Sequence, residues 1–158
     1  MAKEVKTNAM RMLDKAKISY EINLYKCENF VDGVSIADAL GQPYDSSFKT
    51  LVTVGKSGGH HVFVLPIAED LDLKKAAKSV GEKSISMIPV KEITPLTGYI
   101  RGGCTCIGMK KQFPTVIHSS AQSFDKIIVS GGKIGAQIFI APSDLAKAAN
   151  AKFDDIIM

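Results

Sequence analysis

The sequence predicts one domain of the α+β class, with a mixed, mostly antiparallel sheet of about seven strands flanked by helices. The chain has 158 residues, of which 46% are hydrophobic, and this suffices for one sizeable core over residues 1–158. Apolar residues alternate in some segments, as in strands, and recur every three or four residues in others, as in helices. Glycine-containing turns join some strands directly, which favours a mixed sheet over a doubly wound parallel one.

The first forty residues predict two helices around a strand. Apolar residues of segment 7–17 fall near one stripe, which indicates an amphipathic helix. Segment 19–24 alternates apolar and polar residues, as a strand does. Ser35 is followed three residues later by an acidic residue, as in a capping box, and Gly41 can end the helix expected over 35–40.

The middle of the chain predicts a hairpin followed by a helix. Segments 49–54 and 61–65 are apolar and rich in β-branched residues, and a Lys-Ser-Gly-Gly turn separates them. The next apolar residues follow the helical i, i+3, i+4, i+7 pattern over 73–80. Asp72 can cap this helix and Gly81 can end it.

The remaining elements are shorter. Segment 84–88 predicts a strand, and 90–93 a helical turn. The next helix is expected to start at Thr94-Pro95 and to end at Gly98, because proline suits a first helical position. The last expected elements are strands at 115–118, 126–129 and 137–140, and a helix from Ser143 to Ala149 with Asn150 as its stop.

The composition indicates a cytoplasmic protein. No apolar run reaches the roughly 18 residues of a membrane span, and the N-terminal stretch is mixed and amphipathic rather than a secretion signal. The formal net charge of +4 and the pI of about 8.9 permit an RNA or phosphate partner without requiring one. No run of five or more like charges suggests a basic arm. We expect neither a membrane nor DNA as partner.

The cysteines predict reduced thiols rather than a metal site. Their number is odd, and no secretion signal precedes them. Cys104 and Cys106 supply two zinc ligands, whereas a tetrahedral site needs more. Cys27 and the three histidines, His60, His61 and His118, could complete such a site, but their spacing matches no zinc finger or ribbon. A redox pair is an alternative that lacks the usual Cys-x-x-Cys spacing.

Lys49 is the charged residue that is hardest to place on the predicted strands. It shares one face of its strand with Leu51 and Thr53, directly after a polar turn. An ammonium beside apolar neighbours is costly to bury without a partner, and a bound phosphate, ester or carboxylate would be such a partner. The alternative is a lysine whose stem lies on the core while its ammonium reaches water. The segment itself leaves both interpretations open.

Two glycine pairs, Gly102-Gly103 and Gly131-Gly132, could form an anion-binding floor, the second directly after Ser130. Glycine lets the backbone approach a ligand and adopt dihedral angles that aim successive N–H groups into one concavity. Such groups can stabilise a carbonyl oxygen that gains charge. The alternative for each pair is an ordinary tight turn.

Eight segments, taken in order, carry a resemblance to a known family. They are residues 48–52, 71–78, 96–99, 102–103, 108–111, 114–117, 129–133 and 141–145. Phe-Lys-Thr-Leu and Val-Ser-Gly-Gly are the most specific among them. Together they resemble the YbaK/EbsC family, which is similar to the editing domain inserted in bacterial prolyl-tRNA synthetases. The resemblance spans nearly the whole chain.

This resemblance implies an enzyme that removes a wrong amino acid from tRNA. The implied fold is a mixed α/β domain whose sheet forms a partly closed barrel. The YbaK branch is associated with Cys-tRNA(Pro) and works beside prolyl-tRNA synthetase, so the implied partners are the aminoacylated 3′ terminus of tRNA and that synthetase. The implied chemistry needs no cofactor, no metal and no protein nucleophile, because the substrate thiol attacks its own ester carbonyl and forms a cyclic thiolactone.

The resemblance also implies the site residues. Lys49 lies at the family's functional lysine, where it is expected to bind the terminal adenosine or its phosphate, or to order the site. Tyr25 and Phe30 approximately match its aromatic pocket positions. Thr50, Gly103 and Ser130 also lie at positions implicated in the family. With the glycine segments, the candidate site comprises Tyr25, Phe30, Lys49, Thr50, Gly102, Gly103, Ser130, Gly131 and Gly132.

The chain departs from the family pattern at several positions. The family often has Ile-Ser-Pro after its glycine pair, where this chain has Cys104, a threonine and Cys106. Gln137 stands where some members carry a carboxylate, and His118 where Asp or Asn is common. These changes leave the accepted amino acid open more than they affect the fold.

The sequence therefore leaves three hypotheses for the function. The first is a deacylase for Cys-tRNA(Pro), or for another substrate such as Ala-tRNA(Pro). The second is a non-catalytic member that binds tRNA or a synthetase. The third is a Cys/His metal or thiol-redox protein. The sequence decides neither the oligomeric state nor whether tRNA identity is read directly, although the missing basic arm predicts weak tRNA selectivity.

Overall fold

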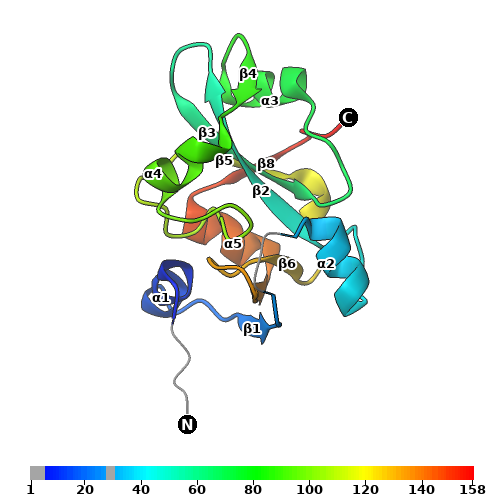
Figure 1. Cartoon of the computed structure of the whole chain (residues 1–158). Helices are drawn as coiled ribbons and strands as arrows, with labels where there is room; N and C mark the ends of the chain where they lie inside the picture. Colours follow the sequence, from blue (N-terminus) through cyan, green and yellow to red (C-terminus); the bar gives the residue numbers. More distant parts are fainter. Residues whose placement is uncertain (1–5, 28–30) are drawn as a thin grey trace.

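The computed structural model describes residues 6–27 and 31–158, and it has two β-sheets with helices packed around them (Figure 1). The strands are β1 (Glu21–Leu24), β2 (Phe48–Gly55), β3 (His60–Pro66), β4 (Ile85–Met87), β5 (Thr115–His118), β6 (Ile127–Ser130), β7 (Ala136–Ile140) and β8 (Lys152–Asp154). The helices are α1 (Asn8–Lys15), α2 (Gly33–Leu40), α3 (Leu73–Val80), α4 (Ile93–Thr97) and α5 (Pro142–Ala149), with short 3₁₀ turns at Val90–Glu92 and Ser119–Ser123. Every helix in the described residues is too short or too polar to cross a membrane.

The α+β class and the mostly antiparallel pairing are confirmed, but the strands divide between two sheets. One sheet has the order β1-β7-β6 and the other β4-β2-β3-β5-β8. Only the β3–β5 and β5–β8 pairs are parallel in the described part of the chain. Neither of these sheets closes, so the expected partial barrel is not formed. The edge strand β8, which follows α5, was missed because it has a single apolar residue, Phe153, between the charged Lys152 and Asp154.

The two sheets meet along one edge of β2. Ser47, just before β2, forms a parallel bridge with Ile128 of β6. Farther along the same edge, β4 pairs with β2 from Thr53 onward. Between these two junctions, no described strand pairs with this edge of β2. The Ile88 N–H, just after β4, still donates to Val52 O at 3.5 Å. The sheet therefore has a gap beside residues 48–51, and this gap positions the site.

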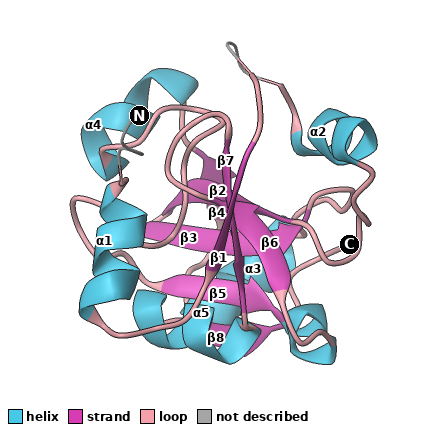
Figure 2. Cartoon of the chain, turned by 90° about the horizontal axis from the view of Figure 1, so that it is seen from below, coloured by secondary structure: helices cyan, strands magenta, loops and turns pink. Residues whose placement is uncertain are grey.

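The inner strands β3 and β5 of the five-stranded sheet are buried almost throughout, and Figure 2 shows helices around the sheet. Val62 and Val64 of β3 belong to a large core cluster that also includes residues of α1, α5 and the three-stranded sheet. Phe63 and Leu65 point to the other face, where a second cluster contains Ala76 and Ala77 of α3 and Ile156 near the C-terminus. Successive strand residues alternate between faces, so a strand buried on both sides is apolar throughout.

Most predicted helix boundaries are confirmed. Helix α1 ends at Lys15, two residues before the expected end, and the other exceptions lie at helix starts. Asp32, rather than Ser35, caps α2, and its carboxylate accepts a hydrogen bond from the Ser35 N–H at 2.8 Å. Helix α4 begins at Ile93, before the expected Thr94. Helix α5 begins with Pro142 at its first position, so Ser143 lies inside the helix and caps nothing. Proline at this position already has the helical φ and lacks an N–H that would need a partner.

Candidate functional site

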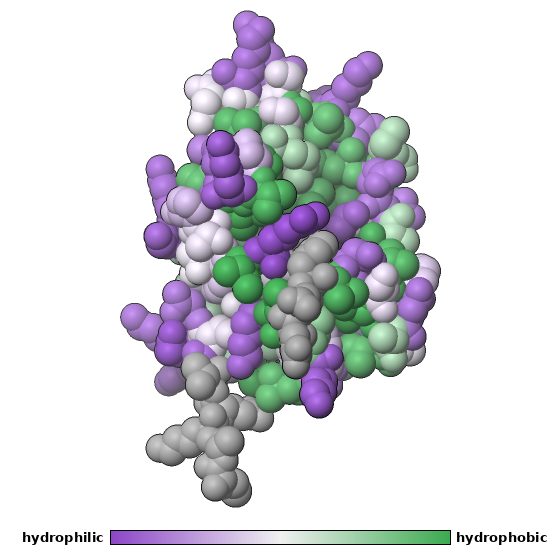
Figure 3. Space-filling model, viewed as in Figure 1, coloured by the Kyte–Doolittle hydropathy of each residue, from purple (hydrophilic) through white to green (hydrophobic). Residues whose placement is uncertain are grey.

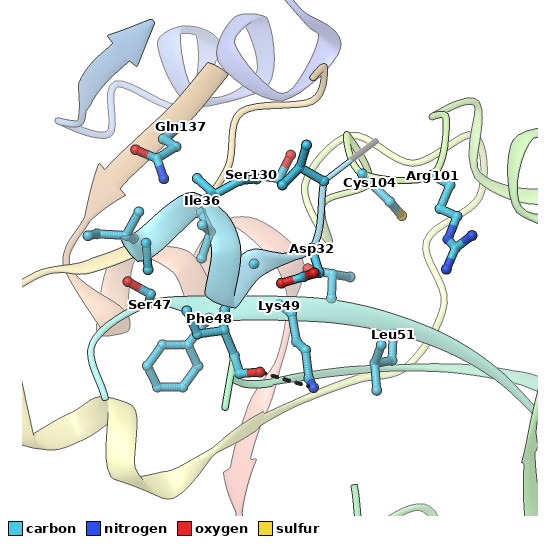
Figure 4. A pocket seen from close by; sticks show the side chains of 18 of the residues that line it. Asp32, Ile36, Ser47, Phe48, Lys49, Leu51, Arg101, Cys104, Ser130 and Gln137 are labelled. Atoms are coloured by element: carbon cyan, nitrogen blue, oxygen red, sulfur yellow. Dashed lines mark hydrogen bonds between the residues drawn. The ribbon is translucent and has the colours of Figure 1, made fainter. Parts of the chain in front are cut away.

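A cavity of about 440 Å³ lies beside the gap in the β2 edge (Figure 4). Residues of β2 form one wall, and residues of β6 and β7 form another. Helix α2, the segment from β4 to α4, and the loop at residues 101–104 supply the remaining walls. On the face shown in Figure 3, apolar side chains gather near the centre. The exposed residues of the lining include the apolar Met87 and Val90 and the charged Asp32 and Arg101, so the mouth is only partly apolar.

The cavity brings together five of the residues predicted from the sequence. Tyr25, Lys49, Thr50, Gly102 and Ser130 all line it, although more than a hundred residues separate the first from the last. The other three candidates that the structure describes, Gly103, Gly131 and Gly132, lie outside the lining. Phe30 lies outside the described residues.

Lys49 is half-buried at the wall formed by β2. Its Nζ donates a hydrogen bond to the carbonyl oxygen of Ile67 at 3.3 Å, which Figure 4 shows as a dashed line. Burial lowers the pKa of Lys49, while the nearby carboxylates of Asp70 and Glu69 oppose this shift. Only a backbone carbonyl and more distant carboxylates thus face this ammonium among the described residues, and it borders a cavity that an anionic or ester ligand can enter.

The two glycine segments pack against each other rather than presenting all their amides to the cavity. A Cβ on Gly103 would lie 2.8 Å from the Cα of Lys133, so the close approach of the two backbones requires glycine. The Gly103 N–H donates to Ile100 O at 3.0 Å.

The second glycine pair is engaged in the same way. The Gly131 N–H donates to Ala136 O at 2.8 Å. The Gly132 N–H donates to the Ser130 hydroxyl at 3.3 Å. Of the four expected glycine donors, only the Gly102 amide both borders the cavity and lacks an acceptor among the described residues. The expected floor of bare glycine amides is therefore reduced to one.

The thiols at the site are protonated at neutral pH. Cys104 lines the cavity, and burial raises its pKa to about 11. Cys106 is fully buried behind it, and burial raises its pKa to about 12. A thiol in this state is a poor nucleophile and a poor metal ligand. In residues 6–27 and 31–158, no three His, Cys, Asp or Glu side chains form a group that could hold a metal ion.

The sequence reasoning missed an amide pair that lines the cavity. The Gln42 and Gln137 side chains exchange two hydrogen bonds, of 2.8 and 2.9 Å. Asn23 of β1 also donates to the Gln137 Oε1, at 3.0 Å. These bonds join the residue after the α2 C-cap to β7 and thereby hold α2 over the cavity. In the sequence, Gln137 is visible only as a polar residue between the apolar Ala136 and Ile138. Its hydrogen-bond partner Gln42 lies 95 residues away, so the sequence does not reveal the pair.

Comparison with known proteins identifies the family. Residues 28–148 match the aminoacyl-tRNA editing domain. The chain belongs to the aminoacyl-tRNA editing domain family. This match confirms the expectation of an enzyme that edits aminoacyl-tRNA.

One curated relative belongs to the branch that the sequence resembled. It is EbsC of Enterococcus faecalis, 47% identical over 152 residues, which are 96% of this chain and 93% of the relative. EbsC is provisionally named a Cys-tRNA(Pro)/Cys-tRNA(Cys) deacylase. The resemblance to the YbaK/EbsC family is thereby confirmed.

Solved structures share the fold at lower sequence identity. The crystal structure of hypothetical protein APE2540 has a TM-score of 0.87 at 20% identity and covers 96% of this chain and 99% of its own. A structure described as a trans-editing enzyme for prolyl tRNA synthetase has a TM-score of 0.82 at 22% identity, with coverage of 98% and 99%. Similarity at these identities supports the fold of the editing domain.

Proposed function

We propose that this protein is a trans-editing deacylase that clears mischarged Cys-tRNA(Pro). The observation that carries the proposal is the shared cavity: Lys49 and Thr50 of β2 and the distant Ser130 of β6 line one pocket beside an open strand edge. The name of the 47% identical EbsC supports the cysteinyl substrate. The description of the solved trans-editing enzyme supports the link to prolyl-tRNA synthetase.

The proposed reaction uses the thiol of the substrate as nucleophile. Its sulfur bonds to the ester carbonyl carbon, and the bond from that carbon to the ribose oxygen then breaks. The ribose oxygen leaves with the thiol proton, so the products are intact tRNA and a cysteine thiolactone that water later opens. The attack is intramolecular, so holding the reacting groups in line supplies much of the acceleration. The raised pKa of Cys104, the thiol in the cavity wall, supports a mechanism without a protein nucleophile.

Lys49 binds the substrate in this proposal. Its ammonium lies at the wall of the cavity, where it can attract the phosphate or the ribose of the terminal adenosine. The apolar walls and the neutral Gln42–Gln137 pair favour a small, uncharged aminoacyl side chain. A pocket distinguishes side chains that differ by one methylene by only about 1–3 kcal/mol, so a synthetase that accepts a competitor of similar size benefits from a second enzyme.

The tRNA body is recognised weakly in this proposal, and the synthetase supplies the specificity. The net charge is only +4, and no run of basic residues forms an arm. We therefore expect the purified protein to deacylate Cys-tRNA(Pro) and Cys-tRNA(Cys) at similar rates. The reaction takes place in the cytoplasm, where tRNA is charged.

A panel of mischarged tRNAs tests the function. The protein should release cysteine from Cys-tRNA(Pro) faster than it releases alanine or serine from the matching substrates. Lys49→Ala should lower this rate by about 100-fold, because a misplaced substrate loses the benefit of orientation. Lys78→Ala, which removes an exposed lysine of α3, is the control and should leave the rate unchanged.

Two outcomes would contradict the proposal at different points. If no mischarged tRNA is deacylated faster than in buffer, the protein is a binding member of the family and not a deacylase. If deacylation occurs but Lys49→Ala is as active as Lys78→Ala, with both variants folded by circular dichroism, Lys49 has no part in it.

A further inference from the structure

The hydrogen bonds of β2 determine which of its main-chain groups face the cavity. On one side, β2 pairs with β3 through its odd-numbered residues. The Ile67 N–H donates to Ser47 O at 2.9 Å, and the Gly55 N–H donates to Gly59 O at 2.8 Å. In an antiparallel ladder, successive residues direct their N–H and C=O groups to alternate edges. The even-numbered residues of β2 must therefore direct these groups away from β3.

The bonds on the other edge agree with this alternation. The Ile128 N–H donates to Ser46 O at 2.9 Å, and the Lys56 N–H donates to Ser84 O at 3.0 Å. Thr50 lies between these two junctions, at an even-numbered position. Its main-chain N–H and C=O therefore point to the edge where β6 and β4 diverge.

No described strand pairs with Thr50 at this edge. Thr50 is opposite Val64 of β3, but only as a pair that exchanges no main-chain hydrogen bonds. The β4 ladder begins at Thr53, and the bridge to β6 involves Ser47. Thr50 lines the cavity and is partly exposed. One donor and one acceptor of a regular strand thus border the cavity without a partner strand.

An aminoacyl ester matches this pair of groups. Its α-amino group and its ester carbonyl are attached to the same carbon, as the N–H and C=O of a peptide residue are. In an antiparallel sheet, one residue exchanges both of its main-chain hydrogen bonds with a single residue on the next strand. Peptide ligands add to open sheet edges through such bonds.

We propose that the aminoacyl group binds as a one-residue strand on the open edge of β2. The Thr50 N–H donates to the ester carbonyl oxygen, and the Thr50 C=O accepts a hydrogen bond from the α-amino group. This inference rests on the proposed deacylase function and names the main-chain groups that hold the reacting carbonyl. Thr50 is a catalytic residue through its backbone, because its N–H touches the oxygen that gains charge when the thiol sulfur attacks.

The internal bonds of the glycine segments support this assignment. The amides of Gly103, Gly131 and Gly132 already have acceptors within the protein. The Thr50 N–H, held by the ladders on both sides of it, is fixed before substrate arrives. A fixed donor needs no reorganisation during the reaction, which is why such donors are effective.

Replacement of one amide by an ester tests the proposal in the full-length protein. Incorporating the α-hydroxy analogue of threonine at position 50 removes the N–H and keeps the side chain. The rate on Cys-tRNA should fall by roughly 10²–10³-fold, the usual effect of losing one such donor. The unfolding temperature should change little, because this N–H has no partner in the free protein.

Thr53 provides a matched control in the same strand. It is also a threonine, it is buried, and it is odd-numbered, so its N–H faces His61 of β3. The same replacement at Thr53 should lower the unfolding temperature and leave the rate per folded molecule unchanged. If the two variants lose activity equally, or if the Thr50 replacement leaves the rate intact, the proposal is wrong.

Hydrogen exchange tests the open edge without any assay of activity. In the free protein, the Thr50 amide should exchange quickly and the Thr53 amide slowly. A minihelix RNA carrying cysteine through a stable amide link should slow exchange at Thr50. Slow exchange at Thr50 in the free protein would overturn the inference even if the protein is a deacylase. If wild-type protein deacylates nothing and the minihelix leaves Thr50 unchanged, the proposed function fails together with the inference.

Discussion

At the scale of single residues, the chemistry of the site is set by burial more than by charged partners. The pKa of Lys49 is lowered because its ammonium is half-buried, and the carboxylates of Asp70 and Glu69 only oppose this shift. The thiol of Cys104 is kept protonated because burial raises its pKa to about 11. The cavity therefore holds a cation whose charge is lost more easily than that of an ordinary lysine, and its wall also contains a thiol that stays neutral.

The lowered pKa of Lys49 predicts how substrate binding depends on pH. The lysine is charged below its pKa and neutral above it, so binding should weaken as the pH rises through a value below the ordinary lysine pKa of about 10.4. Lys49→Arg keeps its charge throughout this range, because an arginine pKa exceeds about 12. The measurement is the affinity for the amide-linked cysteinyl minihelix between neutral and alkaline pH. Identical profiles for wild type and Lys49→Arg would show that the charge on Lys49 does not govern binding.

At the scale of elements, the predicted N-cap residue is correct for α3 and wrong for α5. Asp72 was predicted to cap α3, and its carboxylate accepts hydrogen bonds from the N–H groups of Lys74 and Lys75 at 2.9 and 3.0 Å. Ser143 was predicted to cap α5, but Pro142 starts that helix one residue earlier. Both residue types are good caps, so the sequence pattern alone could not separate the two cases.

These two positions form a matched test of capping. Asp72→Ala should lower the free energy of unfolding by about 1 kcal/mol, because two N–H groups at the start of α3 lose their acceptor. Ser143→Ala should change it by less than about 0.5 kcal/mol, since this exposed hydroxyl caps nothing. Urea unfolding of both variants measures the difference. Equal losses would mean that Ser143 stabilises α5 in solution.

The C-terminal segment depends on a neutral histidine. His118, at the end of β5, is buried, and its Nδ1 accepts a hydrogen bond from the Ile156 N–H at 3.3 Å. The Ile156 carbonyl in turn accepts from the Asp72 N–H at 2.8 Å, so this bond connects the tail to the start of α3. Burial lowers the pKa of His118 and thereby favours the neutral form that this contact needs.

This histidine predicts that the protein loses stability in mild acid. Because the folded pKa is lowered, the unfolded chain takes up a proton first as the pH falls below the ordinary histidine pKa of about 6.5. At about pH 5.5, stability should be lower than at about pH 7.5 by up to about 1.4 kcal/mol from this group. His118→Asn keeps an acceptor near Nδ1 but does not titrate, so it should lose less between these two conditions. Urea unfolding of both proteins at the two pH values decides the matter, and an equal loss would exclude His118 as the cause.

At the scale of the whole molecule, the five-stranded sheet is shared by two core clusters. Ile138 lies in the cluster between the sheets, and Ile156 lies in the cluster under α3, and both are fully buried. Alternate residues of β3 belong to the two clusters. Unfolding of either cluster would therefore disturb β3 and with it the packing of the other cluster. We therefore expect the clusters to unfold together, as one domain.

Two isoleucine truncations test this cooperativity. Ile138→Ala and Ile156→Ala should each lower the free energy of unfolding by about 2–5 kcal/mol. The chain has four tyrosines and no tryptophan, and Tyr20 packs against the cluster that contains Ile138. Tyrosine fluorescence therefore reports on that side. Ile156→Ala should move the fluorescence transition as far as the circular dichroism transition, and separate transitions would show two independent parts.

Much of the site could be predicted because its residues lie in recognisable local segments. Lys49 is a charge on an apolar strand, and Ser130 precedes a glycine pair. Tyr25 and Thr50 were implied only by the resemblance to the family. The Gln42–Gln137 pair could not be predicted, because nothing local to either residue indicates a partner 95 positions away. The hydrogen bond from the Gly103 N–H to Ile100 O could not be predicted either. A glycine pair has the same local sequence pattern in a turn and in a binding site.

The sequence alone determined the local structure of this protein: the alternation of its strands, the stops of its helices at glycine or asparagine, and the family to which it belongs. These features follow from backbone dihedral preferences and periodicity, which act over a few neighbouring residues. Only the tertiary structure decided that the strands divide into two open sheets and that β6 and β4 leave the edge of β2 unpaired at Thr50. A strand edge is filled or left open by segments distant in the chain, so the cavity exists only once those segments have taken their places.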